Sequence, residues 1–159
     1  MKKLTLLLSL VLVLLVGLAV YFYFGGTLSV RSTAHTAGAA EYPEAFASVR
    51  KLVGSGAVAQ TLDAAPIGED PSAYALVDVT IDLYNRGMFP AEWLDIRVEG
   101  APGDIAVYSL TGEGSDIPAR GSGQVNLKLI TAAAPGTARQ CVIQYYVYGM
   151  KRTVTVPVE

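Results

Sequence analysis

The chain has 159 residues, of which 52% are hydrophobic and 16% charged, with a formal net charge of −2. This length suits one domain with an attachment. Without Lys2 and Lys3, ten basic residues stand against fourteen acidic ones, and so mildly acidic a composition excludes a nucleic-acid-binding surface. The single cysteine, Cys141, excludes an intramolecular disulfide, so the stability must come from a hydrophobic core.

The beginning of the chain predicts a membrane-spanning helix. Residues 4–24 contain no charged side chain, and a helix of that length spans about 30 Å, the thickness of the hydrocarbon layer of a bilayer. Aromatic residues 21–24 lie where rings favour the headgroup zone, and Gly25-Gly26 then breaks the helix. Because Lys2 and Lys3 outweigh Arg31, we expect residues 1–3 to form a cytoplasmic tip and the rest to be extracytoplasmic.

A cleaved signal peptide is the alternative for this segment. The apolar part of a signal peptide is usually about 7–15 residues long, with a small-x-small cleavage site close behind it. This run is longer, and the nearest plausible site, residues 38–40, lies well past its end. No cysteine follows the run directly, which excludes a bacterial lipoprotein. We therefore expect an uncleaved signal anchor in the cell membrane.

Residues 25–55 are expected to connect the membrane helix to the domain that follows. Residues 25–40 are small and polar, which indicates a flexible tether. Residues 41–53 carry apolar side chains at helical spacing, with Pro43 tolerated in the first turn and Gly54 at the end. We expect this amphipathic helix to pack on the domain or on the tether. A helix lying on the membrane surface is the alternative, for which Arg50-Lys51 make a thin basic face.

Residues 75–87 contain the clearest strand of the chain. Apolar residues alternate there with polar ones, which places the apolar set on one face of a strand. The apolar set is Val77, Val79, Ile81 and Leu83, and the polar set is Asp78, Thr80, Asp82 and Tyr84. Asn85-Arg86-Gly87 then supplies residues that tolerate turn conformations.

Further short segments with the character of strands surround this one. We expect strands at residues 57–62, 75–84, 93–99, 105–110, 125–129, 140–148 and 153–158, the last two joined as a hairpin across residues 149–152. Seven short strands at this spacing are typical of an all-β, immunoglobulin-like antiparallel β-sandwich. The expected bounds of this extracytoplasmic domain are residues 56–159.

Three segments behind the apolar run, VDVTIDLYNRGMFP, DIPARGSGQVNLKL and YYVYGMKRTVTVPV, carry a family resemblance. Together they resemble the late-embryogenesis-abundant type-2 family, or WHy (water stress and hypersensitive response) domains, over about residues 75–158. Asn85 and Pro90 match the Asn-Pro-Asn-like turn of that family, whereas Arg86-Gly87 replaces its Pro-Asn. Adhesion-type and CARDB-like modules share similar signals and imply the same fold.

The resemblance implies an immunoglobulin-like sandwich without catalytic residues. Members of the family are mostly non-enzymatic. Stress protection has been suggested for them, as has lipid binding for some membrane-anchored members.

Residue types that support catalysis are not arranged for it. His35, the only histidine, lies in the expected tether, where nothing holds partners in a fixed geometry. A hydrolase triad is therefore not available to Ser109, Ser115 or Ser122. We expect no enzyme.

Metal binding is not indicated either. Five acidic loop residues could gather around calcium, but their spacing does not match a dedicated calcium loop, and solvated charge explains them better. These residues are Glu69, Asp70, Asp104, Glu113 and Asp116. Asp78 and Asp82, four residues apart on one strand, are too distant to share a proton. We expect no cofactor and no metal.

Cys141 alternates with Ile143, Tyr145 and Val147 on one face of a strand, which predicts a buried and inert thiol. An intermolecular disulfide is the alternative in an exported protein.

The aromatic residues Trp93, Tyr146 and Tyr148 are the candidate partner surface. On a strand, Tyr146 and Tyr148 share one face, and at a sheet edge they would offer a flat contact area to a partner. The alternative that we favour is a half-buried aromatic patch across neighbouring strands.

These observations predict a single-pass membrane protein that presents a non-catalytic sandwich as a protein-interaction or structural module of the cell envelope. A protein partner or a second copy of the chain is the expected partner. A lipid-binding or lipid-handling domain is the alternative, which would need an apolar cavity between the sheets.

Overall fold

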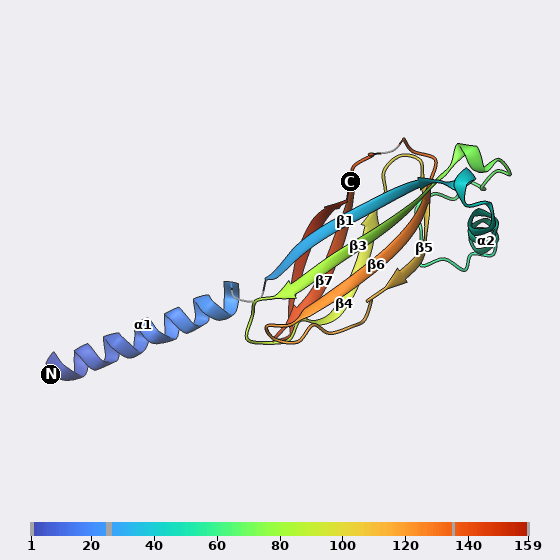
Figure 1. Cartoon of the computed structure of the whole chain (residues 1–159). Coiled ribbons are helices and arrows are strands. Elements are labelled where there is room, and N and C mark those ends of the chain that lie inside the picture. The colour runs from blue at the N-terminus through green and yellow to red at the C-terminus, as the bar shows by residue number, and fades with distance from the viewer. Residues whose placement is uncertain (1, 25–26, 135, 159) are drawn as a thin grey trace.

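The computed structural model describes residues 2–24, 27–134 and 136–158. It consists of a β-sandwich and a long helix, α1, that projects from one end of it (Figure 1). The helices are α1 (Lys2–Phe24), η1 (Ala39–Glu41), α2 (Pro43–Gly54) and η2 (Pro71–Ala73). The strands are β1 (Leu28–Gly38), β2 (Gln60–Thr61), β3 (Ala75–Asn85), β4 (Glu92–Glu99), β5 (Asp104–Thr111), β6 (Ser122–Thr131), β7 (Arg139–Val147) and β8 (Met150–Val158).

The strands form two antiparallel sheets, a five-stranded one in the order β1-β3-β6-β5-β2 and a three-stranded one in the order β4-β7-β8. If the two-residue strand β2 is set aside, the remaining seven take the A-B-E-D and C-F-G order of a constant-type immunoglobulin domain. The expected all-β, immunoglobulin-like sandwich is therefore confirmed.

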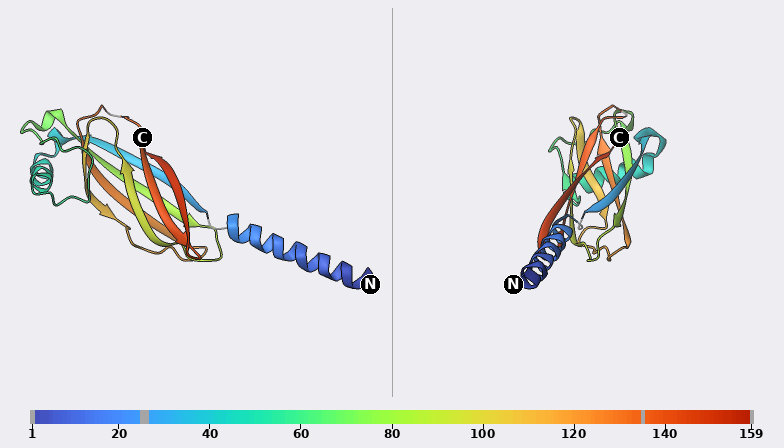
Figure 2. Two further views of the ribbon diagram at one scale, coloured as in Figure 1. Left: turned by 180° about the vertical axis from the view of Figure 1, so that it is seen from behind. Right: turned by 90° about the vertical axis from the view of Figure 1, so that its left-hand side faces the viewer.

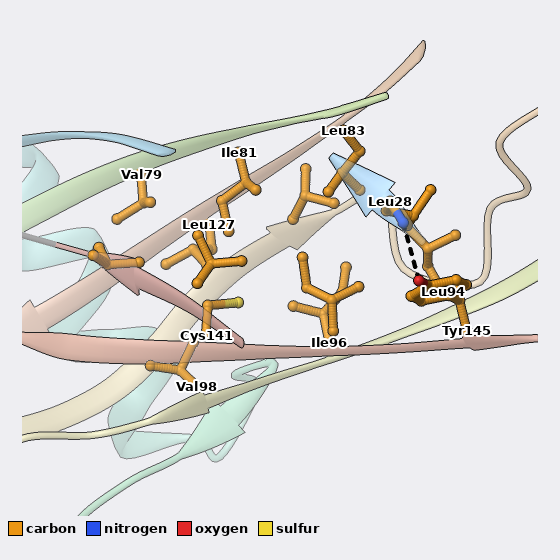
Figure 3. Packing of buried hydrophobic residues seen from close by; sticks show 14 of the residues in the cluster. Leu28, Val79, Ile81, Leu83, Leu94, Ile96, Val98, Leu127, Cys141 and Tyr145 are labelled. Atoms are coloured by element: carbon orange, nitrogen blue, oxygen red, sulfur yellow. Dashed lines mark hydrogen bonds between the residues drawn. The ribbon is translucent and has the colours of Figure 1, made fainter. Parts of the chain in front are cut away.

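The core lies between the two sheets, and the alternating residues of β3 supply its centre. Val77, Val79, Ile81 and Leu83 are at most 2% exposed. They meet inward residues of β6 and of the three-stranded sheet, among them Leu127, Ile96 and Tyr145 (Figure 3). The period of two that identified this strand in the sequence is thus the pattern of its burial.

Strand β1 corrects the expected tether. Residues 28–38 pair with β3 over its whole length, from Leu28 opposite Asn85 to Gly38 opposite Ala75. The sandwich therefore begins at Leu28 and not at residue 56. The sequence conceals this strand because the set that faces inward includes Ser32 and Ala34, which are small, so that hydrophobic alternation is weak. The predicted break at Gly25-Gly26 lies outside the described residues.

Helix α2 confirms the predicted amphipathic helix, with Pro43 at its start. Its buried residues, Phe46 and Val49, join a second, smaller hydrophobic cluster with Ile105 and Ile130 of the five-stranded sheet. Figure 1 and the left view of Figure 2 place α2 at the end of the sandwich far from α1. Because its apolar side is buried against the sheet, α2 does not have a free apolar face for a membrane surface.

Two further boundaries differ from expectation. The strand expected at residues 57–62 is reduced to Gln60–Thr61, since the Ala57 amide instead donates to the Leu52 carbonyl at the end of α2. The last hairpin turns at Tyr148-Gly149, where both φ angles are positive (57° and 69°), and Met150 already belongs to β8. Positive φ at both central residues is the requirement of the tight two-residue hairpin turn.

Polar groups join the two sheets at both ends. Near α1, the Leu28 amide donates to the buried Tyr145 hydroxyl over 3.0 Å (Figure 3). At the far end, the Arg139 guanidinium of β7 donates to both carboxylate oxygens of Asp104 in β5, at 2.8 and 2.7 Å. Both side chains of this ion pair are at most 5% exposed.

The open side of the sandwich between β2 and β4 is bridged by one side chain. The Gln60 amide donates to the Val98 carbonyl over 2.8 Å and accepts from the Val98 amide over 3.0 Å. On the opposite side, the Ser32 hydroxyl of β1 donates to the Pro157 carbonyl of β8 over 2.7 Å. Both gaps between the sheets are thereby closed by hydrogen bonds.

Helix α1 lies apart from the sandwich in Figure 1 and in the left view of Figure 2. Among the described residues, it is the one helix long and apolar enough to cross a membrane, and its span Lys3–Tyr21 is not buried in the structure. Length and composition of this kind suit a membrane anchor or a signal sequence. The side chains of residues 22–24, expected in the headgroup zone, lie outside the described residues.

The buried ion pair generates a first prediction, for the variant Arg139→Met. Burial alone raises the pKa of Asp104, but the hydrogen bonds and charge of Arg139, with further hydrogen bonds from Thr131 and the Ala101 amide, outweigh it and lower that pKa. Without Arg139, Asp104 is a buried and unpaired charge, so we expect the free energy of unfolding at pH 7 to fall by about 3–5 kcal/mol. Urea denaturation of the full chain in micelles, followed by circular dichroism, measures this loss.

The pH dependence of that loss follows from the direction of the pKa shift. In the wild type, the Asp104 carboxylate stabilises the fold above its ordinary pKa, and this contribution is lost as the pH falls through the lowered pKa. In Arg139→Met, burial raises the pKa, so the difference from the wild type should begin to shrink as the pH falls through this raised pKa, above the ordinary value, and should be lost once the pH has passed the lowered pKa of the wild type. Lys128→Met is the control, because it breaks a half-exposed pair with Asp78 that is worth at most about 1 kcal/mol. An equal loss of unfolding free energy in Arg139→Met and Lys128→Met would contradict a stabilising role for the buried pair of Arg139 and Asp104.

Candidate functional site at the end next to α1

Three connections meet at the end of the sandwich next to α1. The start of β1 lies beside the end of β3, where Leu28 pairs with Asn85. The loop at residues 86–91 follows β3, the loop at residues 112–121 precedes β6, and the turn Tyr148-Gly149 joins β7 to β8. An isolated bridge between Ala91 and Ile117 holds the two loops together through hydrogen bonds of 2.9 and 2.7 Å.

Large apolar side chains are exposed mainly at this end. Outside α1, eight of them are exposed in the described part of the chain, and six of the eight lie on these connections or within two residues of a strand end. We call the six the aromatic surface: Tyr84, Met88, Trp93, Tyr146, Tyr148 and Met150. The other two, Tyr42 and Leu52, lie next to and on α2. The aromatic surface is therefore a feature of one end of the molecule.

Trp93 is the most exposed member, at 73%. It lies in a β-bulge where the register of β4 on β7 shifts between Glu92 and Asp95, and its φ is +56°. The Asp116 carboxylate accepts a hydrogen bond from the Trp93 amide over 2.9 Å and so fixes the bulge. Bulges commonly redirect a side chain, and a bulky residue at positive φ is rare because it costs free energy.

Tyr148 lies in the hairpin turn and is 52% exposed. Its φ of +57° is again one that glycine and asparagine adopt at a lower cost. Its ring packs against Phe89 of the loop at residues 86–91, with the ring centroids 3.9 Å apart. The turn and the loop thus support each other.

Asn85 orders the loop that carries Met88 and Phe89. Its buried side-chain amide donates to the carbonyls of Phe89 and Ile117, at 2.8 and 3.3 Å, and its oxygen accepts from the Gly87 amide at 2.9 Å. This local turn confirms the predicted strand end at Asn85-Arg86-Gly87.

Charged side chains border the aromatic surface. Arg86, Arg120 and Lys151 are exposed. Glu92 directly precedes Trp93 in the sequence, and Asp116 accepts a hydrogen bond from the Trp93 amide. Arg120 has a φ of +55°. The three residues other than glycine with positive φ in the described chain are thus Trp93, Arg120 and Tyr148, and all three lie at this end.

The structure brings the predicted residues Trp93, Tyr146 and Tyr148 to the same end of the sandwich. The prediction that Tyr146 and Tyr148 share one face of a strand is wrong, because the strand ends at Val147. The pairing partners of Tyr146 are Glu92 and Lys151, so the favoured aromatic patch across neighbouring strands does not describe it. Sequence reasoning missed Tyr84, Met88, Met150 and Arg120, for which only the meeting of the loops gives a signal.

The other candidates are dispersed. His35 is exposed on β1 opposite Asp78, which forms an ion pair with Lys128 at 2.8 Å. Of the acidic loop residues, Glu69 binds Arg50 at 3.0 Å, Asp70 accepts a hydrogen bond from the Ser72 amide, and Asp104 is held by Arg139. Within residues 2–24, 27–134 and 136–158, no three or more His, Cys, Asp or Glu residues gather as a metal site.

The outer face of the five-stranded sheet is polar and hollowed by two open grooves. Their volumes are about 580 Å³, beside Arg31, Asp82 and Gln124, and about 530 Å³, beside His35 and Asn126. Side-chain amides connect them, since Gln124 donates to Asp82 at 3.0 Å and Asn126 donates to Gln124 at 3.3 Å. These grooves offer hydrogen-bonding groups beside apolar surface.

Neither a known protein family nor a curated protein matches the sequence. Among solved structures, the chain is similar to the Northeast Structural Genomics Consortium target SoR45, with 14% identity, a TM-score of 0.44 and coverage of 82% of this chain and 83% of that one. It is also similar to the cupredoxin domain of amoB from Nitrosocaldus yellowstonii, with 14% identity, a TM-score of 0.37 and coverage of 82% and 84%. Likenesses this distant do not bear on function.

A second prediction concerns the strained position of Trp93. Trp93→Gly keeps the amide that Asp116 binds and relieves the positive φ, while it removes little buried area. We expect the free energy of unfolding to change by less than about 1 kcal/mol, because the relief offsets the greater chain entropy of glycine. Leu94→Ala, next to it and 2% exposed, should cost about 2–5 kcal/mol. Urea denaturation compares the two, and a loss in Trp93→Gly as large as that in Leu94→Ala would assign Trp93 a structural role.

A third prediction concerns Cys141, which is buried between the sheets (Figure 3). Burial raises the pKa of its thiol to about 12. The thiolate is the reactive form of cysteine. We therefore expect an aromatic disulfide reagent at pH 8 to leave Cys141 unmodified in the folded protein and to modify it fully in about 8 M urea. Fast labelling of the folded protein, or a disulfide-linked dimer on a non-reducing gel, would contradict a buried and inert thiol.

Proposed function

We propose that this protein is a single-pass membrane protein whose β-sandwich acts, outside the cytoplasm, as a non-catalytic protein-interaction or structural module of the cell envelope. The observation that carries the proposal is the short link between α1 and β1. An apolar helix ends at Phe24 and the sandwich begins at Leu28. A domain joined so closely to a membrane span works at the membrane surface.

The orientation follows from the charges beside the helix. Lys2 and Lys3 lie at the start of α1 and Arg31 follows its end, a bias that favours a cytoplasmic N-terminus. The length of the apolar run favours an anchor that is retained over a signal peptide that is cleaved.

The outer sheet face and the far end with α2 are the surfaces available to a protein partner. Two open polar grooves lie on that sheet face, lined by groups such as Asp82, Gln124 and Asn126 that form hydrogen bonds. Polar and partly hydrated contacts are common in interfaces between proteins. A second copy of the chain is one such partner.

A non-catalytic role is supported by where the reactive residue types lie. His35 is exposed on an outer strand, Cys141 is buried, and the acidic residue Asp104 is neutralised by Arg139. Each is accounted for by folding or by exposure to solvent. The resemblance to the late-embryogenesis-abundant type-2 family supports the same class of function.

Lipid handling within the sandwich is the alternative. It requires an apolar space between the sheets for an acyl chain. That space is filled by side chains such as Ile81, Leu127 and Ile143, all at most 1% exposed, so a lipid would have to separate the sheets. The packing therefore favours the interaction role.

A fourth prediction tests the topology. We expect Ala138→Cys, an exposed position in the loop before β7, to react with a membrane-impermeant maleimide on intact cells, while a cysteine inserted after Met1, which leaves Lys2 and Lys3 in place, reacts only after lysis. The native Cys141 is buried and does not interfere. Labelling of the inserted cysteine on intact cells, or a mature chain that lacks residues 4–24, would overturn the anchored orientation.

Native mass spectrometry of the full-length protein, extracted gently from its own membrane, tests the role. Co-purified protein subunits, or a defined homo-oligomer, support the interaction module. A single chain that carries a lipid-sized mass favours the lipid-handling alternative, and a bare monomer at all detergent strengths contradicts both.

A further inference from the structure

We propose that the aromatic surface docks on the headgroup layer of the membrane that α1 crosses, so that the sandwich stands on the bilayer with this end down. The inference rests on the proposed anchoring by α1. It goes beyond that proposal because it assigns an occupant, the lipid interface, to the surface formed by Tyr84, Met88, Trp93, Tyr146, Tyr148 and Met150.

The link between helix and sandwich brings this end to the membrane. Phe24 and Leu28 are four Cα steps apart, a distance of at most about 15 Å in any conformation. The headgroup zone adds about 5–8 Å to each side of the hydrocarbon layer. Leu28 is tied to Asn85 by strand pairing and to Tyr145 by a hydrogen bond, so the aromatic end is the part of the sandwich held nearest to the lipid.

The chemistry of the exposed side chains matches this environment. Tryptophan and tyrosine are enriched where a bilayer meets water, because their rings are apolar and carry one polar group. One tryptophan, three tyrosines and two methionines are exposed at this end, whereas Tyr42 and Leu52 are the large apolar side chains exposed elsewhere outside α1 in the described chain. The apolar exposure is therefore concentrated where the membrane lies.

The backbone at this end adopts conformations that folding alone does not favour for these residue types. Trp93, Arg120 and Tyr148 occupy positive φ angles, which glycine or asparagine adopt at a lower cost. Strained positions of this kind persist mainly where the side chain has a function. Trp93 buries little of its area in the sandwich, so packing within the domain does not explain it.

The charges at this end predict how binding depends on the lipid. Arg86, Arg120 and Lys151 are exposed at this end, and the acidic residues Glu92, Glu113 and Asp116 match them in number. Docking should therefore rely on the aromatic rings and weakly on anionic lipid or salt. This distinguishes it from a polybasic membrane site, whose binding falls steeply with ionic strength.

Trp93 is the only tryptophan, so its fluorescence reports on the surface directly. The full chain is reconstituted into phosphatidylcholine vesicles, and flotation in a density gradient first checks that α1 holds it in the bilayer. We expect Trp93 emission at a shorter wavelength than in the urea-unfolded chain, and about twofold quenching when the lipid carries bromine near the top of the acyl chains. Iodide added to the water should quench Trp93 fluorescence weakly. Salt at about 0.5 M should change neither the emission wavelength nor the quenching by brominated lipid.

The matched control moves the tryptophan to the other end. In Trp93→Phe/Tyr42→Trp, the only tryptophan replaces an exposed residue beside α2. Its emission should stay at the long wavelength of an exposed ring, with strong iodide quenching and no quenching by brominated lipid.

A second variant weakens the surface without removing the reporter. Tyr148→Asn suits the hairpin turn, where Asn-Gly is the preferred pair. We expect it to fold, as circular dichroism checks, and to shift Trp93 towards quenching by iodide.

The outcomes separate the two proposals. A chain that does not float with vesicles overturns the anchoring by α1. A chain that floats, with Trp93 open to iodide and insensitive to brominated lipid, leaves the anchor intact and overturns the docking. Protection of Trp93 from both quenchers also overturns it, since the surface is then covered by another protein chain.

Discussion

Strand β1 begins four residues after the end of α1 and pairs with β3 along eleven residues. This pairing is the constraint on which the arrangement of the molecule depends. It places the first strand of the sandwich directly after the apolar helix, and the hydrogen bond from Leu28 to Tyr145 fixes the start of that strand against the opposite sheet. A force or tilt applied through α1 therefore acts on a paired edge strand of the five-stranded sheet and not on a loose segment.

The rest of the structure keeps the two sheets in register around that strand. Buried polar contacts lie at opposite ends, Tyr145 with Leu28 next to α1 and Asp104 with Arg139 at the far end. Between them the space is filled by apolar side chains at close to zero exposure. Because the core is held at both ends, the connecting loops start and end at fixed positions. This keeps Trp93 and Tyr148 at positive φ angles, which a loop without such constraints would not maintain.

The sequence predicted the sandwich well wherever burial alternates with a period of two. The strand at residues 75–85 and the final hairpin follow from this pattern, and Pro43 and Gly54 mark the helix that precedes them. The pattern does not reveal β1, because a strand whose inner side is partly serine and alanine is recognised only through its partner. The aromatic surface was predicted only in part, because it also depends on contacts between segments that are distant in the sequence. Trp93, Tyr146 and Tyr148 are conspicuous as residue types, but the loops that gather Met88 and Arg120 beside them are separated by many residues in the chain.

The hydrogen bonds that close the sides of the sandwich have a consequence for proteins crowded in a membrane. Confinement to two dimensions brings copies of a domain side by side, and a bare edge strand then invites another strand to join the sheet. Here the outer edge of β4 is already bonded, at Val98 by the Gln60 amide and at Leu94 by the loop at residues 112–121. On β8, Pro157 has no amide hydrogen and its carbonyl accepts from Ser32. Lateral growth by strand addition is blocked at these positions, so copies anchored side by side by α1, as proposed, can meet as folded domains without merging their sheets.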